Sequence, residues 1–222
     1  MDINAWSVIC EKYFKVKTLY IEGEEYDPKL KSNLQPLNEL RNALDHVFRI
    51  VALELKREID GDNPDLKLQL EKQFYELDRH LTLVFYDVCD YLSLAYRNRI
   101  NDILKPYSSS VIRNAFPNYY REMRPKIEEI NGKFALLRGK RSELGSEGDD
   151  DEVFYQHLLE LQKYYQTIYQ GIHILEDFNR DEEKQIAERE KDRKETRFLG
   201  IGGWILTIVL TILGIIIGYL LK

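Results

Sequence analysis

A run of 24 consecutive residues without a charged side chain, Phe198 to Leu221, is the strongest constraint on what this chain can form. A helix rises 1.5 Å per residue, so about 20 apolar residues cross the ~30 Å hydrocarbon core of a bilayer. Apolar side chains would lie on every side of this helix, whereas a helix in a soluble domain carries one apolar stripe. The sequence therefore predicts a transmembrane helix over residues 198–221.

The residues that flank this run predict its orientation. Residues 191–197 contain four basic and two acidic side chains, and only Lys222 follows the run. Basic residues next to a span stay on the cytoplasmic side of the membrane. We therefore expect a single-pass protein of the inner (cytoplasmic) membrane with its N-terminal domain in the cytoplasm, inserted after translation like a tail-anchored protein.

Small and hydroxyl side chains within the run predict contacts between helices. Two glycines four residues apart form a GxxxG pair, which lets two membrane helices approach closely. Two threonines one turn apart add hydrogen-bonding groups, for a helix–helix face or for the lining of a narrow pore. The residues expected at this membrane or oligomer face are Gly203, Thr207, Thr211, Gly214 and Gly218.

The composition of the remaining chain favours an all-α domain and excludes several classes of site. The net charge of −6 provides no general attraction for nucleic acid, so RNA binding would need a local basic patch. Cys10 and Cys89 lack the spacing of a zinc site, and His157 and His173 are too far apart on one helix to share a metal. Phosphate-loop, nucleophile-elbow, HExxH and EF-hand patterns are also missing. The sequence predicts no metal site and no cofactor.

Apolar spacing predicts about five long helices before the span. The first covers residues 2–22 and ends at Gly23. The second starts near Pro36 and stops at the turn before Pro64, and the third continues from there to about Leu104, so these two form an antiparallel hairpin. The apolar seam expected to pack the second helix is Leu37, Leu40, Leu44, Val47, Val51 and Leu55.

Two further helical regions complete the predicted bundle. One covers residues 111–137 with interruptions at Pro117 and Pro125. The last begins near Asp149 and continues without a break through a regular heptad seam: Phe154, Leu158, Leu161, Tyr165, Ile168, Ile172 and Leu175. The predicted domains are a helical bundle over 1–178, a charged stalk over 179–197 and the transmembrane helix over 198–221. A helix is favoured for the stalk, with a disordered linker as the competing interpretation.

One group of polar residues, within NELRNALDHVFR, stands out as a candidate functional site. Arg41 and His46 lie on one helix, and their side-chain directions differ by about 140°. Asn42 lies one turn before His46, where it could orient the imidazole, and Asp45 lies one turn after Arg41, where it could pair with it. The competing interpretation is an Arg41–Asp45 surface pair, with His46 as a residue at the boundary between core and surface.

The Arg41-x4-His46 pattern resembles the signature of the HEPN superfamily. The resemblance implies an all-α bundle and, in active members, a metal-independent ribonuclease that works as a dimer. His46 would then act as general acid and base, Arg41 would stabilise the scissile phosphate, and Asn42 would orient the pair. A HEPN-like bundle with a membrane anchor also resembles the accessory proteins of type VI-B CRISPR systems, which implies membrane pores and antiphage defence. An inactive HEPN-like site is favoured over an active one.

Three functions remain open from the sequence. The first is a defence effector whose helical domain oligomerises and whose spans perturb the inner membrane or form a pore in it. The second is a tail-anchored scaffold that binds a protein partner, and the third is a membrane-tethered HEPN ribonuclease. The glycines and threonines of the apolar run favour the first.

Overall fold

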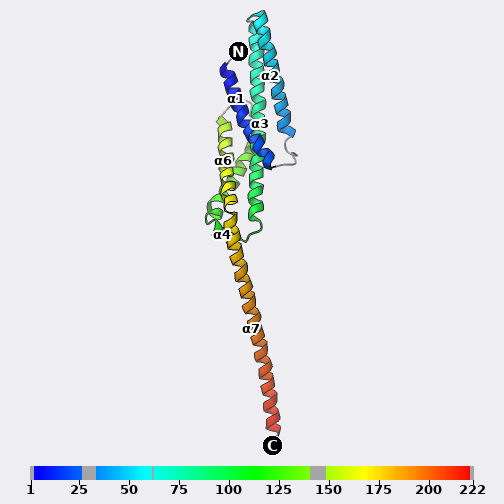
Figure 1. The fold of residues 1–222 in the computed structure, drawn as a ribbon, viewed down its shortest axis with the longest axis vertical. Helices are drawn as coiled ribbons and strands as arrows, with labels where there is room; N and C mark the ends of the chain where they lie inside the picture. The colour runs from blue at the N-terminus through cyan, green and yellow to red at the C-terminus, as the bar shows by residue number, and fades with distance from the viewer. Residues whose placement is uncertain (1–2, 27–33, 62, 141–148, 221–222) are drawn as a thin grey trace. The chain divides into compact units, whose positions relative to one another are not determined.

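The structure is a computed structural model that describes residues 3–26, 34–61, 63–140 and 149–220. Over these ranges the chain forms helices and no strand, which confirms the predicted all-α class. The helices are α1 (Ile3–Tyr26), α2 (Leu34–Asp60), α3 (Pro64–Leu104), α4 (Ser109–Ala115), the π-helical turn η1 (Tyr119–Met123), α5 (Arg124–Lys140), α6 (Asp149–Gln170) and α7 (Ile172–Leu220). Figure 1 shows their course.

The chain divides into two compact units. Unit 1 consists of Met1–Pro106 and Pro117–Gly171, and unit 2 consists of Tyr107–Phe116 and Ile172–Lys222. Unit 1 therefore contains α1, α2, α3, η1, α5 and α6, whereas unit 2 contains α4 and α7.

The predicted α2–α3 hairpin is confirmed and forms the framework of unit 1 (Figure 1). Gly61 adopts a φ of 82° at the turn, a conformation that favours glycine. The Asn63 side chain then caps α3 by accepting a hydrogen bond from the Asp65 backbone N–H at 2.9 Å. Pro64 fits the first turn of α3. A backbone N–H at that position would have no acceptor within the helix, so the absence of this group from proline costs no hydrogen bond.

α3 is the central helix of unit 1 and packs against α1, α2, α5 and α6. Lys12 of α1 is bound to α3 by hydrogen bonds from its Nζ to Asp78 Oδ1 at 2.6 Å and to Thr82 Oγ1 at 2.9 Å. A buried cluster joins α1, α3 and α6 further along: the Tyr96 hydroxyl donates to Glu22, and Gln162 Nε2 donates to the same carboxylate oxygen at 2.6 Å.

The prediction that Gly23 ends the first helix is wrong. α1 continues to Tyr26, and Gly23 lies buried against Tyr91 of α3. A Cβ atom at residue 23 would come within 3.1 Å of Tyr91 Cε1, and the Tyr91 hydroxyl donates to the Gly23 carbonyl at 3.1 Å. The glycine therefore allows a close approach between α1 and α3.

The predicted seam of α2 combines residues from two different faces. Leu40 and Val47 are partly buried and pack against the core, together with the buried Ala43 and Ile50. The other four predicted seam residues are exposed: Leu37, Leu44, Val51 and Leu55. α2 thus carries an inner apolar face, which packs in unit 1, and a second apolar face that is exposed in this chain.

The two prolines of the fourth predicted region have different effects. α4 ends at Ala115, two residues before Pro117, so the predicted interruption there is confirmed. At Pro125 the helical backbone is not broken: the π-helical turn ends at Met123 and α5 begins at Arg124, so the predicted interruption is a change of helix type rather than a break. The π-helical turn η1 leads directly into α5.

The last predicted helix is divided at Gly171. α6 ends at Gln170 and α7 begins at Ile172, and the Gly171 N–H is shared between the carbonyls of Thr167 at 3.2 Å and Ile168 at 3.1 Å. Glycine is among the least favourable residues inside a helix, which explains why the break falls here. Five residues of the predicted seam are buried: Phe154, Leu158, Leu161, Ile168 and Leu175.

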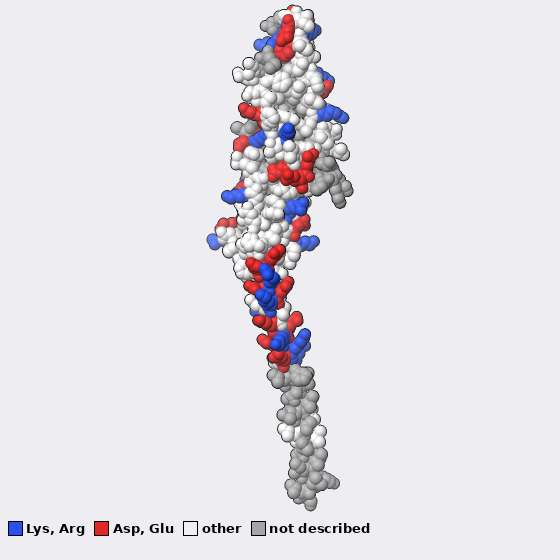
Figure 2. Space-filling view, viewed as in Figure 1, with Lys and Arg blue, Asp and Glu red and all other residues white. Residues whose placement is uncertain are grey.

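Unit 2 is built on α7, which extends without interruption from Ile172 to Leu220. Near its start, α4 packs against α7, and the Ser108 and Ser110 hydroxyls donate to Glu182 of α7. The helix includes residues 179–197, where acidic and basic side chains alternate along its surface (Figure 2). Within the described part of the chain, no helix meets the length and apolarity needed to cross a membrane.

Candidate functional site

Two histidines and a glutamate from the α2–α3 hairpin lie close together in unit 1. His46 extends from α2, and Glu76 and His80 extend from α3. One ring nitrogen of each histidine and one carboxylate oxygen of Glu76 lie within 4.8 Å of one another. The imidazole rings are stacked, with 5.2 Å between their centroids and 22° between their planes.

Each histidine is held by a side chain from the opposite helix. His80 Nδ1 lies 2.6 Å from Glu39 Oε2 of α2, and His46 Nδ1 lies 2.7 Å from Gln73 Oε1 of α3. A carboxylate oxygen only accepts hydrogen bonds, so the proton of neutral His80 is on Nδ1, and the carbonyl oxygen of Gln73 assigns the same tautomer to His46. In the neutral form of each ring, the lone pair is then on Nε2.

Glu76 is oriented by an arginine from its own helix. Arg79 Nε donates to Glu76 Oε2 at 2.8 Å. This hydrogen bond, aided by the positive charge of Arg79, lowers the pKa of Glu76 from its usual value. Glu76 is therefore ionised at neutral pH, with one oxygen bound to Arg79 and the other available for a ligand.

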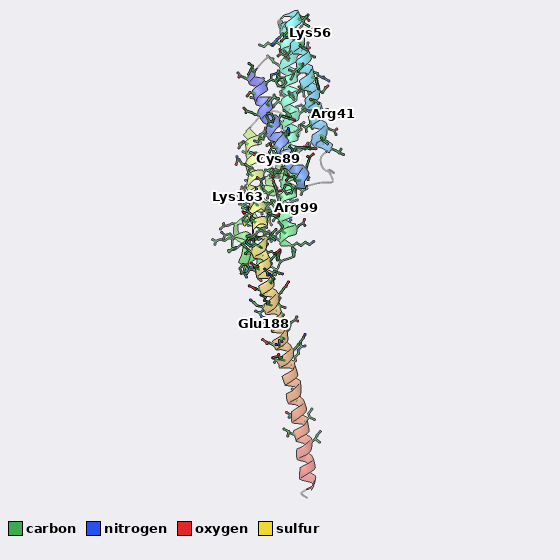
Figure 3. All side chains as sticks on the ribbon, viewed as in Figure 1. Arg41, Lys56, Cys89, Arg99, Lys163 and Glu188 are labelled. Atoms are coloured by element: carbon green, nitrogen blue, oxygen red, sulfur yellow. The ribbon has the colours of Figure 1, made fainter. Side chains whose placement is uncertain are left out.

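The structure separates the residues of the predicted nuclease motif. His46 is half-buried in the hairpin, whereas Arg41 is exposed on α2 (Figure 3). Gln73, rather than Asn42, holds the His46 ring, and Asp45 pairs with Arg49 at 2.7 Å rather than with Arg41. Across the described residues, no hydrogen bond or ion pair links Arg41 or Asn42 to His46.

The predicted membrane-face residues lie in α7. Thr207 and Thr211 are exposed, and the Thr211 hydroxyl donates to the Thr207 carbonyl within the helix at 2.7 Å. Gly203, Gly214 and Gly218 fall outside the residues whose surroundings the structure describes.

The second face of α2 forms an apolar surface, which we call the outer seam. Its members recur at alternating intervals of three and four residues, the period of a coiled coil. Arg41 occupies one position of the same repeat. The outer seam consists of Leu34, Leu37, Leu44, Phe48, Val51 and Leu55, each at least 46% exposed.

An apolar groove lies beside the outer seam, between α1 and α2. Its volume is about 390 Å³, and its walls include Trp6, Cys10 and Phe14 from α1 and Leu40 and Leu44 from α2. Phe14 and Leu44 are also more than half exposed. The groove and the outer seam therefore form one continuous apolar surface in unit 1, because Leu44 belongs to both.

The His46–Glu76–His80 cluster was not predicted from the sequence. The available signal was Glu76-x3-His80, whose side chains share one helix face, together with a histidine on the partner helix of the hairpin. The exposure of the outer seam was also missed, since both faces of α2 are apolar.

Comparisons with known proteins leave the chain to be interpreted from its own residues. No protein-family model matches it, and neither a curated protein nor a solved structure matches it.

Proposed function

We propose that this chain is a membrane-anchored helical protein whose unit 1 self-associates through the outer seam and thereby clusters its terminal helices in the membrane. Clustering of these helices perturbs the membrane or opens a pore, the activity expected of a defence effector. The observation that carries the proposal is the exposed heptad pattern of α2, because it offers unit 1 a surface for a second copy.

The size and pattern of the outer seam support self-association. The seam extends from Leu34 to Leu55, which corresponds to about 30 Å of helix. Contiguous exposed apolar surface of this extent is unusual for a monomer and marks an interaction site. The alternating three- and four-residue spacing suits packing against another helix with the same spacing.

The groove between α1 and α2 supports a second copy of the chain as the occupant. Phe48 is exposed in the outer seam, and the exposed Phe14 is part of the wall of the groove that also contains Leu44. In a two-fold symmetric dimer, the same patch on each copy must be complementary to itself. An exposed aromatic side chain and a groove on the same surface meet this requirement, because Phe48 of each copy can pack beside the α1–α2 groove of the other copy.

The membrane anchor is supported by the sequence of α7. Residues 198–220, which are all but the last residue of the run without charge, form its last part, and the charged stretch of 179–197 precedes them on the same helix. Basic residues next to the run favour a cytoplasmic unit 1. The GxxxG pair formed by Gly214 and Gly218 suits close contacts between clustered spans.

The ribonuclease alternative has less support. His46 is bonded to Gln73 inside the hairpin, whereas Arg41 occupies a position in the outer seam. A phosphate held by Arg41 would therefore lie on a different side of α2 from the imidazole.

The experiment uses full-length protein in detergent and Phe48→Asp as the variant. A carboxylate placed in an apolar interface loses its hydration without a partner, so we expect self-association to weaken by on the order of tenfold or more. Lys56→Asp is the matched control, because it adds the same group to an exposed position of α2 outside the seam. Mass is measured by light scattering, and membrane potential is followed in cells that express each variant.

Two results would overturn the proposal. One is wild-type protein that is monomeric at all concentrations tested. The other is a Phe48→Asp variant that assembles and depolarises cells as the wild type does. Binding of a different protein to the seam of a monomeric wild type would instead identify a scaffold.

A further inference from the structure

We propose that His46, Glu76 and His80 form a binding site for a divalent transition-metal ion, with zinc as the best-suited ion. The site goes beyond the proposed function, since it lies between α2 and α3 and shares no residue with the outer seam. The arrangement supplies two nitrogens and one oxygen, a common set of three protein ligands for zinc in sites that retain an open position.

The tautomers place a lone pair on the right atom of each ring. Nδ1 of His46 is bonded to Gln73, and Nδ1 of His80 is bonded to Glu39. Metal-binding histidines commonly use their second ring nitrogen in this way, which fixes the ring and makes the other nitrogen a better ligand. Because Nδ1 is occupied by these partners, Nε2 is the ring nitrogen left for a metal in each histidine.

The carboxylate ligand is held in a similar way. Arg79 binds Oε2 of Glu76 at 2.8 Å and leaves Oε1 for the metal. All three ligands thus have an outer hydrogen-bonding partner, which is a usual feature of a built metal site.

The ligand spacing requires only side-chain adjustment. One ring nitrogen of each histidine and one carboxylate oxygen of Glu76 lie within 4.8 Å of one another. Ligands bound to zinc at about 2 Å in a tetrahedral arrangement would be about 3.4 Å apart. Rotation of side chains can close this difference, because the ligands come from two adjacent helices and His46 and Glu76 are only partly buried.

The ligand types also predict the ions that the site rejects. Magnesium and calcium prefer sites made of oxygen ligands, whereas imidazole nitrogens favour zinc, cobalt, nickel and copper. Three protein ligands leave at least one position for water or for a group from another molecule. We therefore expect zinc and cobalt to bind, and magnesium to leave the site unchanged.

The test measures metal binding by the full-length protein in detergent, purified without a histidine tag and stripped with EDTA. Cobalt(II) chloride and zinc(II) chloride are titrated separately. The expected result is one bound ion per chain, a cobalt absorption spectrum typical of mixed nitrogen and oxygen ligands, and displacement of cobalt by zinc. Magnesium chloride should produce no displacement.

Variants assign the site to its residues. His46→Asn and Glu76→Gln should each weaken zinc binding by at least tenfold, and Gln73→Leu should weaken it by roughly 10- to 100-fold through the orientation of His46. His173→Asn is the matched control, because it removes an exposed histidine of α7 and should leave the affinity unchanged. Helix content, measured by circular dichroism, confirms that each variant is folded.

The proposal is overturned if the wild type binds neither zinc nor cobalt at micromolar concentrations. It is also overturned if folded His46→Asn and Glu76→Gln variants retain the wild-type affinity. Self-association in the absence of metal tests the outer seam separately, so failure of the metal site leaves the proposed assembly intact.

Discussion

α3 and α7 are both long helices, with 41 and 49 residues, but different interactions stabilise them. α3 buries 15 side chains against its neighbours. In α7, none of the described side chains after Leu175 is buried. Apart from the hydrogen bonds that Ser108 and Ser110 donate to Glu182, the contacts seen there are local pairs such as Lys184–Asp181 at 3.4 Å and Asn179–Glu183 at 2.9 Å. Tertiary packing therefore stabilises α3, whereas the charged part of α7 depends on helix propensity and pairs within the helix.

The largest expected effect comes from a cavity in α3. Leu92 is fully buried, so Leu92→Ala should reduce the free energy of unfolding of unit 1 by about 3 kcal/mol. Urea denaturation, followed by the fluorescence of Trp6 in a Trp204→Phe background, measures the loss. Ile186→Ala is the control in α7, where the side chain is half-exposed, and it should leave this transition within about 0.5 kcal/mol. Equal losses of unfolding free energy for Leu92→Ala and Ile186→Ala would contradict the conclusion that tertiary packing stabilises α3 more than α7.

A smaller effect is expected from the buried hydroxyl of Tyr96. Its hydrogen bond to Glu22 joins α3 to α1, so Tyr96→Phe should lower the free energy of unfolding by about 2 kcal/mol near neutral pH. Burial, and then the Glu22 carboxylate, raises the pKa of Tyr96 above its usual value of 10.0.

The raised pKa also predicts a dependence on pH. The neutral hydroxyl is favoured in the folded state, so its contribution is complete below the unfolded-state pKa and is lost as the pH rises through the folded-state pKa. The difference between wild type and Tyr96→Phe should therefore shrink above about pH 10. A constant difference in urea denaturation across this range would show that the hydroxyl proton is not responsible.

The smallest effect is expected within α7. Ala187→Gly should destabilise the helix locally by about 1 kcal/mol, because glycine has a much lower helix propensity than alanine. Faster amide hydrogen exchange in residues 183–191 measures this change, and unfolding of unit 1 should be unaffected. Ala187→Leu, which retains a strong helix former, is the control. A loss of stability in unit 1 would show that the two units are energetically linked.

Local signals were sufficient to predict the α2–α3 hairpin. Asn63 and Pro64 mark the start of α3, and a regular apolar period extends to Leu104, so the bounds depend mainly on nearby residues. The effects of Gly23 and Gly171 on their helices could not be predicted from nearby residues alone. Gly23 is accommodated within α1 because Tyr91 packs closely against it, whereas Gly171 coincides with a break between helices. The same residue type therefore has opposite effects that depend on tertiary contacts.

The candidate sites depend on contacts that the sequence does not specify directly. α2 has apolar residues on two faces, and only the positions of α1 and α3 determine that Leu40 and Val47 pack while Leu44 and Phe48 remain exposed. Likewise, His46 comes close to His80 only because the hairpin has one particular register. The sequence identified His46 as a candidate but assigned it the wrong neighbours.

The length of the turn at Gly61 determines the register between α2 and α3. His46 follows Glu39 by seven residues, and Gln73 precedes His80 by the same number, so the two hydrogen-bonded pairs occupy matching steps on opposite helices. One residue inserted into this turn would rotate the partner face by about 100° and misalign both pairs, although each helix would keep its amphipathic pattern. Insertions and deletions in this turn should therefore be tolerated far less than substitutions of side chains on the hairpin's outer surface.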